Sequence, residues 1–169
     1  QKQRCGWCVG DPLYEAYHDK EWGVPIYDDL KLFEFLILET FQAGLSWITI
    51  LRKRENFRIA FDAFDYKKVA QYDADKFDTL IINKGIIRNK LKIKAAISNA
   101  EAFMKVQAEF GSFSAYIWQF VDGQPKINCF ELRDDVPAKT LESEHMSKDL
   151  KKRGFKFVGA TICYAFMQA

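Results

Sequence analysis

A carboxylate lies deep within the most apolar stretch of the chain. Residues 32–51 read LFEFLILETFQAGLSWITIL, and Glu39 is flanked there by apolar residues on both sides. A helix that is apolar on nearly every side is normally a core helix, and an ionised side chain in such a place is costly unless it has a partner. Glu39 therefore either satisfies a structural donor or waits for a ligand that brings donors or positive charge.

The composition predicts one folded domain. The chain has 169 residues, of which 49% are hydrophobic and 15% aromatic, which is enough for a substantial core. Glu39 and Gln42 interrupt the only apolar run that approaches membrane-spanning length. The N-terminal QKQRCGW lacks the apolar core of a signal peptide, and the four cysteines show no dense disulfide framework. We expect a reduced, cytoplasmic protein that does not enter membranes and is a monomer by default.

Helical patterns dominate the chain, and we expect an all-α fold. Residues that favour N-caps predict helix starts at Asp28 or Asp29, Ser46, Asp65, Asp73 and Ser112. The expected helices cover about residues 29–43 (ended by Gly44), 47–60, 66–71, 74–82, 89–108 and 112–121, then a basic helix that starts at Ser143 or Ser147 and ends at Gly154, and an apolar helix from about Val158 onward. Residues 124–138, which include two prolines, are expected to be irregular.

Positive charge is gathered in clusters, although the net charge is only +2. The three clusters are Arg52, Lys53, Arg54 and Arg58; Lys84, Arg88, Lys90, Lys92 and Lys94; and Lys148, Lys151, Lys152, Arg153 and Lys156. A near-neutral total with segregated basic clusters suits a protein with one side that faces a polyanion. For any single cluster, a solvated helix face is the better interpretation.

The segment NKGIIRNK, residues 83–90, predicts a tight helical hairpin with Gly85 in its turn. Ile86 and Ile87 would turn inward, while backbone N–H groups of the turn and of the second helix's start would point outward. Such groups, at the positive end of a helix, bind phosphate well, and Lys84, Arg88, Lys90 and Lys92 would add positive charge around them. The alternative is an ordinary corner between two helices.

Four long segments resemble one protein family. They are CGWC with DPLYEAYHDKEWGVP, ETFQAGLSWITILRKRENF, KGIIRNKLKI and LKKRGFKFVGATICYAFMQA, and in this order they are similar to 3-methyladenine DNA glycosylase I. The resemblance implies a helix-hairpin-helix fold in a single domain, 1–169, with two helical lobes around a base-binding cleft. The hairpin element would span about 74–108, and residues 1–27 and 143–169 would form the smaller lobe. It also implies a base-excision repair enzyme that hydrolyses the N-glycosidic bond of 3-methyladenine in double-stranded DNA.

The resemblance implies a role for each residue of a base-binding pocket. A glycosylase takes its base out of the stack, and N3-methylation makes adenine cationic, so aromatic faces and a desolvated carboxylate suit it. Glu39 would hydrogen-bond the base and act as the catalytic group, Trp47 would stack on the base, and Tyr17 would contribute from the other side. Tyr14 and Trp22 would be pocket walls. For an isolated tyrosine or tryptophan, core packing is the usual alternative.

The resemblance also assigns residues to DNA. Leu45 would be the wedge that fills the space left by the extruded nucleotide, a known use of apolar side chains, and the alternative is that Leu45 is merely core. Gln42 would touch opposite or flanking bases, next to Gly44. The hairpin residues Lys84, Gly85, Ile86, Arg88 and Lys90 would hold the phosphate backbone without reading its sequence.

Two aspects of the chemistry depart from the wider superfamily. Many of its members use an aspartate downstream of the hairpin to activate water, but residues 89–121 contain no Asp. Either Glu39 orients the water, or the cationic base leaves with little help. No lysine stands out for Schiff-base chemistry, so we expect a monofunctional enzyme that needs no cofactor for catalysis and releases free 3-methyladenine.

A zinc site is expected in incomplete form. Cys5, Cys8 and His18 are zinc-type ligands close in sequence, and by resemblance Cys5 and His18 bind zinc. The family's other two ligands, a His and a Cys, fall beyond Ala169. We therefore expect the full-length protein to bind one structural zinc and these residues alone to bind it weakly or not at all. Cys129 and Cys163 are expected to be buried thiols.

Three functions compete on these observations. The first is a hydrolase that releases 3-methyladenine, the second a non-catalytic DNA-binding module, and the third a helical protein that binds a small molecule. Glu39 among aromatic residues favours the first over the second, because a pure DNA-binding module needs no acidic aromatic pocket. The basic hairpin favours the first two over the third.

Overall fold

A computed structural model describes residues 3–124, 126 and 136–169, and every regular element within them is a helix. The all-α prediction is therefore confirmed. The α-helices are α1 (Pro12–Lys20), α2 (Asp29–Gln42), α3 (Trp47–Ala60), α4 (Tyr66–Val69), α5 (Ala74–Ile81), α6 (Lys90–Phe110), α7 (Phe113–Trp118), α8 (Leu141–Lys152) and α9 (Ala160–Gln168). Short 3₁₀ helices η1 (Asp62–Phe64) and η2 (Gln119–Val121) follow α3 and α7.

Most helix starts lie where the capping residues predicted them. Asp28, Asp73 and Asn89 each accept a hydrogen bond from a backbone N–H three residues on, at 3.1, 2.9 and 3.1 Å. These bonds satisfy donors that have no partner within the helix. Ser46 is also an N-cap by position, but its hydroxyl lies 2.7 Å from the hydroxyl of Thr49 and makes no backbone cap.

Helix α8 begins earlier than Ser143 or Ser147, so the predicted start is wrong. The helix begins at Leu141, because Thr140 and Ser143 form a capping box: the Thr140 hydroxyl accepts from the Ser143 N–H at 3.1 Å, and the Ser143 hydroxyl accepts from the Thr140 N–H at 2.8 Å. Ser143 and Ser147 are instead buried within the helix. Most of 124–138, including Cys129, lies outside the described residues.

Helix α1 was not predicted, although its signal is present. Asp11 accepts from the N–H groups of Leu13 and Tyr14 at 3.0 and 3.2 Å, and Pro12 occupies the first helical position. Proline is favoured there because its missing N–H would have no partner in the helix anyway. An N-cap followed by proline was thus the available indication of this helix.

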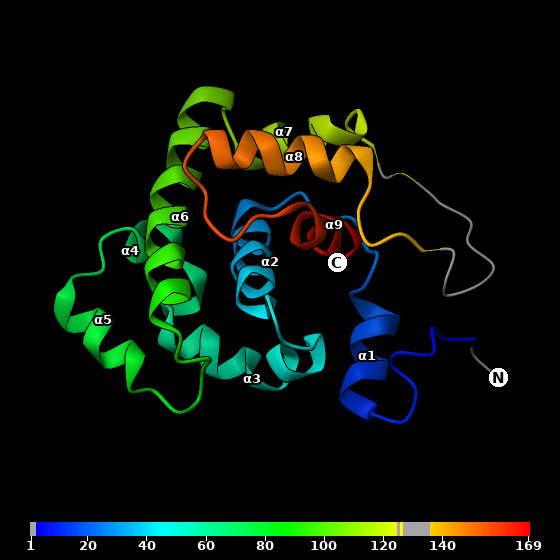
Figure 1. Cartoon of the computed structure of the whole chain (residues 1–169), viewed down its shortest axis with the longest axis horizontal. Helices are drawn as coiled ribbons and strands as arrows, with labels where there is room; N and C mark the ends of the chain where they lie inside the picture. The colour runs from blue at the N-terminus through cyan, green and yellow to red at the C-terminus, as the bar shows by residue number, and fades with distance from the viewer. Residues whose placement is uncertain (1–2, 125, 127–135) are drawn as a thin grey trace.

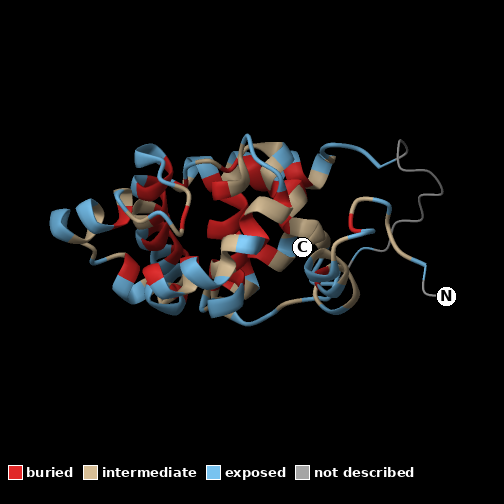
Figure 2. Cartoon of the chain, turned by 90° about the horizontal axis from the view of Figure 1, so that it is seen from below, coloured by how far each residue is buried: buried red, intermediate tan, exposed pale blue. Residues whose placement is uncertain are grey.

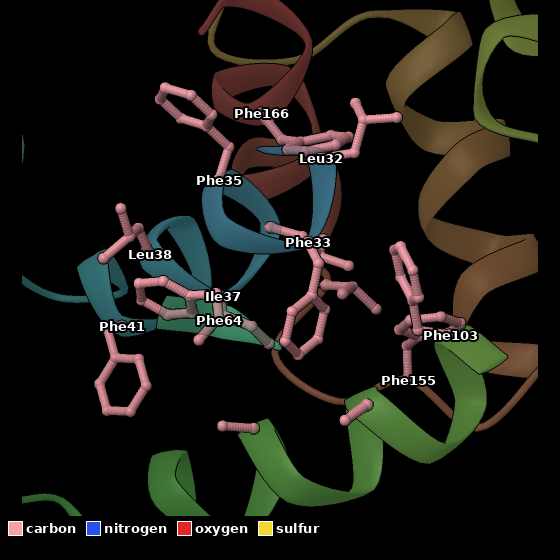
Figure 3. Packing of buried hydrophobic residues seen from close by; sticks show 14 of the residues in the cluster. Leu32, Phe33, Phe35, Ile37, Leu38, Phe41, Phe64, Phe103, Phe155 and Phe166 are labelled. Carbon is pink, nitrogen blue, oxygen red and sulfur yellow. The ribbon is translucent and has the colours of Figure 1, made fainter. Parts of the chain in front are cut away.

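Helix α2 is the centre of the structure. It contacts α3, α6, α7 and α9, and Figure 1 shows it in the middle of the molecule with α6, α3 and α8 around it. Apolar side chains leave α2 on several sides, as the labelled residues of Figure 3 show. On the α6 side, the ring of Phe33 lies 5.1 Å from that of Phe103, between ring centroids. In Figure 2 the buried residues gather in the interior between the helices.

One apolar cluster joins the two ends of the chain to this centre. It includes Tyr17 of α1, Met146 of α8 and Phe166 of α9 together with the α2 residues. The N–H of Gly23 also donates to the carbonyl of Gln168 at 3.0 Å, so the segment after α1 touches α9. The division into two lobes stays a prediction. Among the described residues, no helix combines the length and the apolar character needed to cross a membrane.

Asp29 ties three helices together at the far end of α2 from Gln42. Its carboxylate accepts hydrogen bonds from the Gln107 amide at 2.8 Å and from the N–H groups of Phe113 and Ser114 at 3.0 and 2.9 Å. It therefore satisfies the free backbone donors at the start of α7 and fixes that helix to α2 and α6.

We expect Asp29→Ala to lower the free energy of unfolding by about 3 kcal/mol, because several hydrogen bonds to a charged group are lost. Asp28→Ala is the matched control, since it removes a single exposed cap and should cost about 1 kcal/mol. Urea unfolding measures both. Equal losses for the two variants would show that Asp29 is an ordinary helix cap.

Candidate functional site

Glu39 is a buried acid without a neutralising partner. Its side chain lies on α2 with only 3% of its surface exposed. Its Oε2 atom has no hydrogen-bond partner within the described part of the chain. Burial raises the pKa of Glu39 to about 8. The interpretation that Glu39 satisfies a structural cation or donor therefore finds no support at Oε2.

Trp47 and Tyr17 lie together near this acid. Trp47 is the first residue of α3, and its indole Nε1 is buried without a hydrogen-bond partner. The rings of Tyr17 and Trp47 are 5.5 Å apart and tilted by 47°. Burial, and then the charge of Glu39, raise the pKa of Tyr17 far above its ordinary value. The structure thus brings Glu39, Trp47 and Tyr17 into one group.

Tyr14 and Trp22 belong to a neighbouring aromatic cluster. Burial, and then the charges of Cys8 and Glu39, raise the pKa of Tyr14 above its ordinary value. Trp7 joins the two, with ring centroids 4.7 Å from Tyr14 and 5.6 Å from Trp22. Trp7 was missed as a site candidate, although it lies within the CGWC segment that carried the resemblance.

Two surface hollows of about 460 and 340 Å³ lie away from this group. The first is lined by residues such as Phe110 and Arg153, and the second by residues such as Leu91 and Phe157. Neither has Glu39, Tyr17 or Trp47 in its wall. A base-binding cleft beside Glu39 is not one of these hollows and stays a prediction.

A tight turn follows α2 and presents Leu45. Ala43 has φ −48° and ψ 117°, Gly44 has φ +81°, and the Leu45 N–H donates to the Gln42 carbonyl at 2.6 Å. These values describe a type II turn, in which glycine is favoured at the third position because φ is positive there. Leu45 is 40% exposed. The interpretation of Leu45 as a core residue is therefore wrong, and its use as a wedge stays a prediction.

The segment between α5 and α6 does not provide all of the expected phosphate-binding donors. Ile86 is buried, and Gly85 lies so close to Asn56 of α3 that a Cβ added to it would be 3.1 Å from the Asn56 side chain. The Gly85 N–H donates to the Asn83 side chain at 2.8 Å, and the Ile86 N–H donates to the Asn83 carbonyl at 3.4 Å. These two N–H groups are used within the turn. The prediction that they point outward without partners is therefore wrong.

The charged side chains of the hairpin divide into two kinds. Lys84, Arg88 and Lys90 are exposed, as a phosphate-facing surface requires. Lys92 is only 6% exposed, and its Nζ donates to the carbonyls of Phe41 at 2.9 Å and Ala43 at 2.5 Å. The prediction that Lys92 adds charge around the turn is wrong, because its ammonium group is directed to the end of α2.

The basic cluster of α3 is largely neutralised by acids. Arg52 contacts Asp11 at 2.6 Å, and Arg54 contacts Glu21 through two bonds, one of 2.9 Å. Arg58 pairs with Glu34 and Glu55. This cluster therefore holds α3 to α1, to the segment after it and to α2, and it contributes less to a polyanion-facing surface than its sequence suggested.

Cys5 and His18 lie next to each other, but they do not complete a metal site. The Cys5 N–H donates to Nε2 of His18 at 3.4 Å, and Nδ1 of His18 lies 3.1 Å from Asp19. Within the described part of the chain, no three His, Cys, Asp or Glu side chains are grouped so that they could hold a metal ion. A closed structural zinc site needs four ligands, so these residues alone do not fit one. The expected pair stays a prediction.

Known proteins are similar to this chain in sequence and in fold. DNA-3-methyladenine glycosylase 1 of Escherichia coli (strain K12) is 51% identical over 167 residues, which cover 99% of this chain and 89% of that protein. A crystal structure of 3-methyladenine DNA glycosylase I has a TM-score of 0.96 at 53% identity, with coverage of 99% of this chain and 92% of that one.

A solved variant of 3-methyladenine DNA glycosylase I, in complex with 3-methyladenine, has a TM-score of 0.95 at 38% identity and covers 99% of this chain and 90% of its own. Residues 7–169 match the methyladenine glycosylase family as a whole. With a match over nearly its entire length, the chain belongs to the methyladenine glycosylase family.

Proposed function

We propose that this protein is a DNA-3-methyladenine glycosylase of base-excision repair, which hydrolyses the N-glycosidic bond of 3-methyladenine in double-stranded DNA. The observation that carries the proposal is a pair of buried polar atoms without partners, Oε2 of Glu39 and Nε1 of Trp47. Each unsatisfied group costs about 1–3 kcal/mol. A binding site can tolerate this cost in the free protein, because the bound ligand supplies the missing hydrogen-bond partners.

A methylated adenine has the features that this pair requires. It is flat, it carries positive charge while attached to the sugar, and its edge offers both N–H donors and ring-nitrogen acceptors. The carboxylate of Glu39 would accept from the base, the indole N–H of Trp47 is a donor for an acceptor on the ligand, and the rings of Trp47 and Tyr17 would attract a cation through their faces. Tyr14 and Trp22, with Trp7, would form the walls.

The reaction asks little of the protein beyond binding. Water adds to C1′ of the sugar and loses a proton to solvent, the C1′–N9 bond breaks, and the electron pair of that bond neutralises the cationic ring, so that 3-methyladenine leaves as a neutral base. Glu39 would orient the water or stabilise the positive charge that develops on the sugar. The reaction needs no cofactor. Among the described residues, the buried lysine is Lys92, and its ammonium group is held by two carbonyls, which supports hydrolysis without a lyase step.

The DNA-binding side would combine the hairpin and the turn after α2. Exposed Lys84, Arg88 and Lys90 would contact phosphates, and Leu45 would enter the opened stack beside Gln42. The proposed enzyme acts as a monomer in the cytoplasm. The Cys5 and His18 pair has no part in this proposal.

We expect Glu39→Gln to lower kcat/KM for base release by about tenfold to a hundredfold, because a hydrogen bond to a charged group is worth about 1.5–3 kcal/mol. The measurement is chromatography of bases released from methylated duplex DNA. Glu34→Gln is the matched control, since Glu34 is on the same helix but pairs with Arg58. Unchanged release by the Glu39 variant would remove that residue from its role.

The raised pKa of Glu39 also predicts a pH profile. With a pKa of about 8 in the free protein, the carboxylate form becomes tenfold rarer for each pH unit below that value. We expect kcat/KM to rise with pH up to about 8 and to level off above it. The Glu39→Gln variant should lack this rise. A wild-type profile that is flat between pH 6 and pH 9 would show that the carboxylate form is not the active one.

We expect the double variant Arg88→Ala, Lys90→Ala to bind duplex DNA more weakly at every sequence and to reduce the slope of log K against log salt by about 2. Lys105→Ala, at an exposed position of α6 away from the hairpin, is the control and should leave the slope unchanged. Fluorescence anisotropy over a salt series gives the slopes. An unaltered slope in the double variant would place the phosphate contacts elsewhere.

A further inference from the structure

We propose that Lys92 is a positioning residue that fixes the turn bearing Gln42 and Leu45 against the hairpin helix α6, so that wedge and phosphate-binding surface keep one relative position. The inference builds on the proposed DNA-binding side of the enzyme. It concerns a residue that the sequence placed in the basic surface and that the structure places beneath it.

Two carbonyl oxygens at the end of α2 depend on this lysine. The last carbonyls of a helix have no partner within it, and after α2 only the Gln42 carbonyl is used by the turn itself, through the Leu45 N–H. Nζ of Lys92 donates hydrogen bonds to the carbonyls of Phe41 and Ala43, the residues on either side of Gln42. A cation at the negative end of a helix is also favoured by the helix dipole.

Lys92 is itself held in place by the start of α6. It is the third residue of that helix, two positions after Lys90, and its backbone N–H donates to the Asn89 side chain at 3.1 Å. The residue therefore reaches from the hairpin's second helix directly to the turn after α2, across 49 residues of sequence to Ala43. The contact joins the two surfaces that are proposed to touch DNA.

The base-binding group does not depend on this contact. Phe41 packs through its ring against Phe57 and Phe61 of the core, at 4.9 and 5.9 Å between ring centroids. Glu39 is buried one half-turn earlier in α2, and Trp47 is anchored in α3. Loss of the lysine should therefore release the turn and leave the pocket in place.

A small displacement of Leu45 is enough to affect the reaction. Groups that must be held in a productive geometry lose about a hundredfold in rate when they are misplaced by about 1 Å. Free 3-methyladenine needs no wedge, because it is not stacked in DNA. The role of Lys92 therefore predicts a defect that appears with duplex DNA and is absent with the free base.

The test compares Lys92→Met, which is similar in length but uncharged, with the wild type and with Leu45→Ala. We expect Lys92→Met to slow single-turnover release from methylated duplex by about tenfold to a hundredfold. Its Kd for free 3-methyladenine, followed by tryptophan fluorescence, should stay within about twofold of the wild type, and its salt slope for duplex binding should not change. Lys92→Arg should restore part of the rate.

A second readout does not depend on catalysis. In a duplex with an abasic-site analogue next to 2-aminopurine, insertion of Leu45 should change the 2-aminopurine fluorescence on binding. We expect Leu45→Ala and Lys92→Met to lose most of that change. If the wild type releases no base but this difference persists, the proposed activity fails while the role of Lys92 stands.

Three results would overturn the inference. A parallel loss of free-base binding would make Lys92 a general structural residue, a salt slope reduced by about 1 would make it a phosphate contact, and wild-type behaviour would leave it without a role. If Lys92→Met does not fold, as judged by circular dichroism, Lys92→Gln replaces it. Gln keeps a donor on a shorter side chain, and the same three results apply to it.

Discussion

Helix α2 has almost no solvent-facing side between Leu32 and Phe41, and the rest of the molecule is arranged by the need to cover it. Helices α3, α6, α7 and α9 each pack on part of its surface. A helix of this kind gives high positional precision to whatever it carries, because close-packed interiors resist displacement. The side chain of Glu39 is therefore held in a fixed position, and the low polarity around it raises its pKa.

The C-terminal end of the same helix leads into the proposed DNA-binding side. Within a few residues the chain leaves the core, makes a turn that needs Gly44 at positive φ, exposes Leu45 and re-enters the core at Trp47. The proposed wedge, Leu45, and the proposed stacking residue, Trp47, thus lie on one short connection between two packed helices. Lys92 of α6 ties that connection to the hairpin by donating to two backbone carbonyls. Any residue at positions 41 and 43 would provide such a carbonyl.

Much of the fold could be predicted from local sequence signals, but contacts between residues far apart in the sequence could not. Asp28, Asp73 and Asn89 act on backbone donors only a few residues away, so their capping roles are readable from sequence. Lys92 and Arg54 look like surface charges in basic runs, but their partners lie 33 to 51 residues away along the chain. Nothing in the local pattern distinguishes a lysine that reaches a buried carbonyl from one that reaches water.

The candidate site follows the same division. Glu39 was identifiable because a carboxylate in an apolar helix conflicts with its surroundings, and such conflicts mark functional positions. Trp7 was not singled out, since an isolated tryptophan is usually a core residue and only the folded arrangement places it between Tyr14 and Trp22. The residues of the hairpin were predicted as a group, but the use of its N–H groups by Asn83 depends on turn geometry.

The burial of Glu39 couples folding to the uptake of a proton. In the unfolded chain this carboxyl has its ordinary pKa of 4.5, and in the folded protein its pKa is about 8. Between these values the native state binds a proton that the denatured state lacks, so the conformational stability contributed at this position falls as pH rises through that window and is constant outside it. Folding at neutral pH therefore consumes a proton here, and the proposed capture of a cationic base would return that proton to solvent.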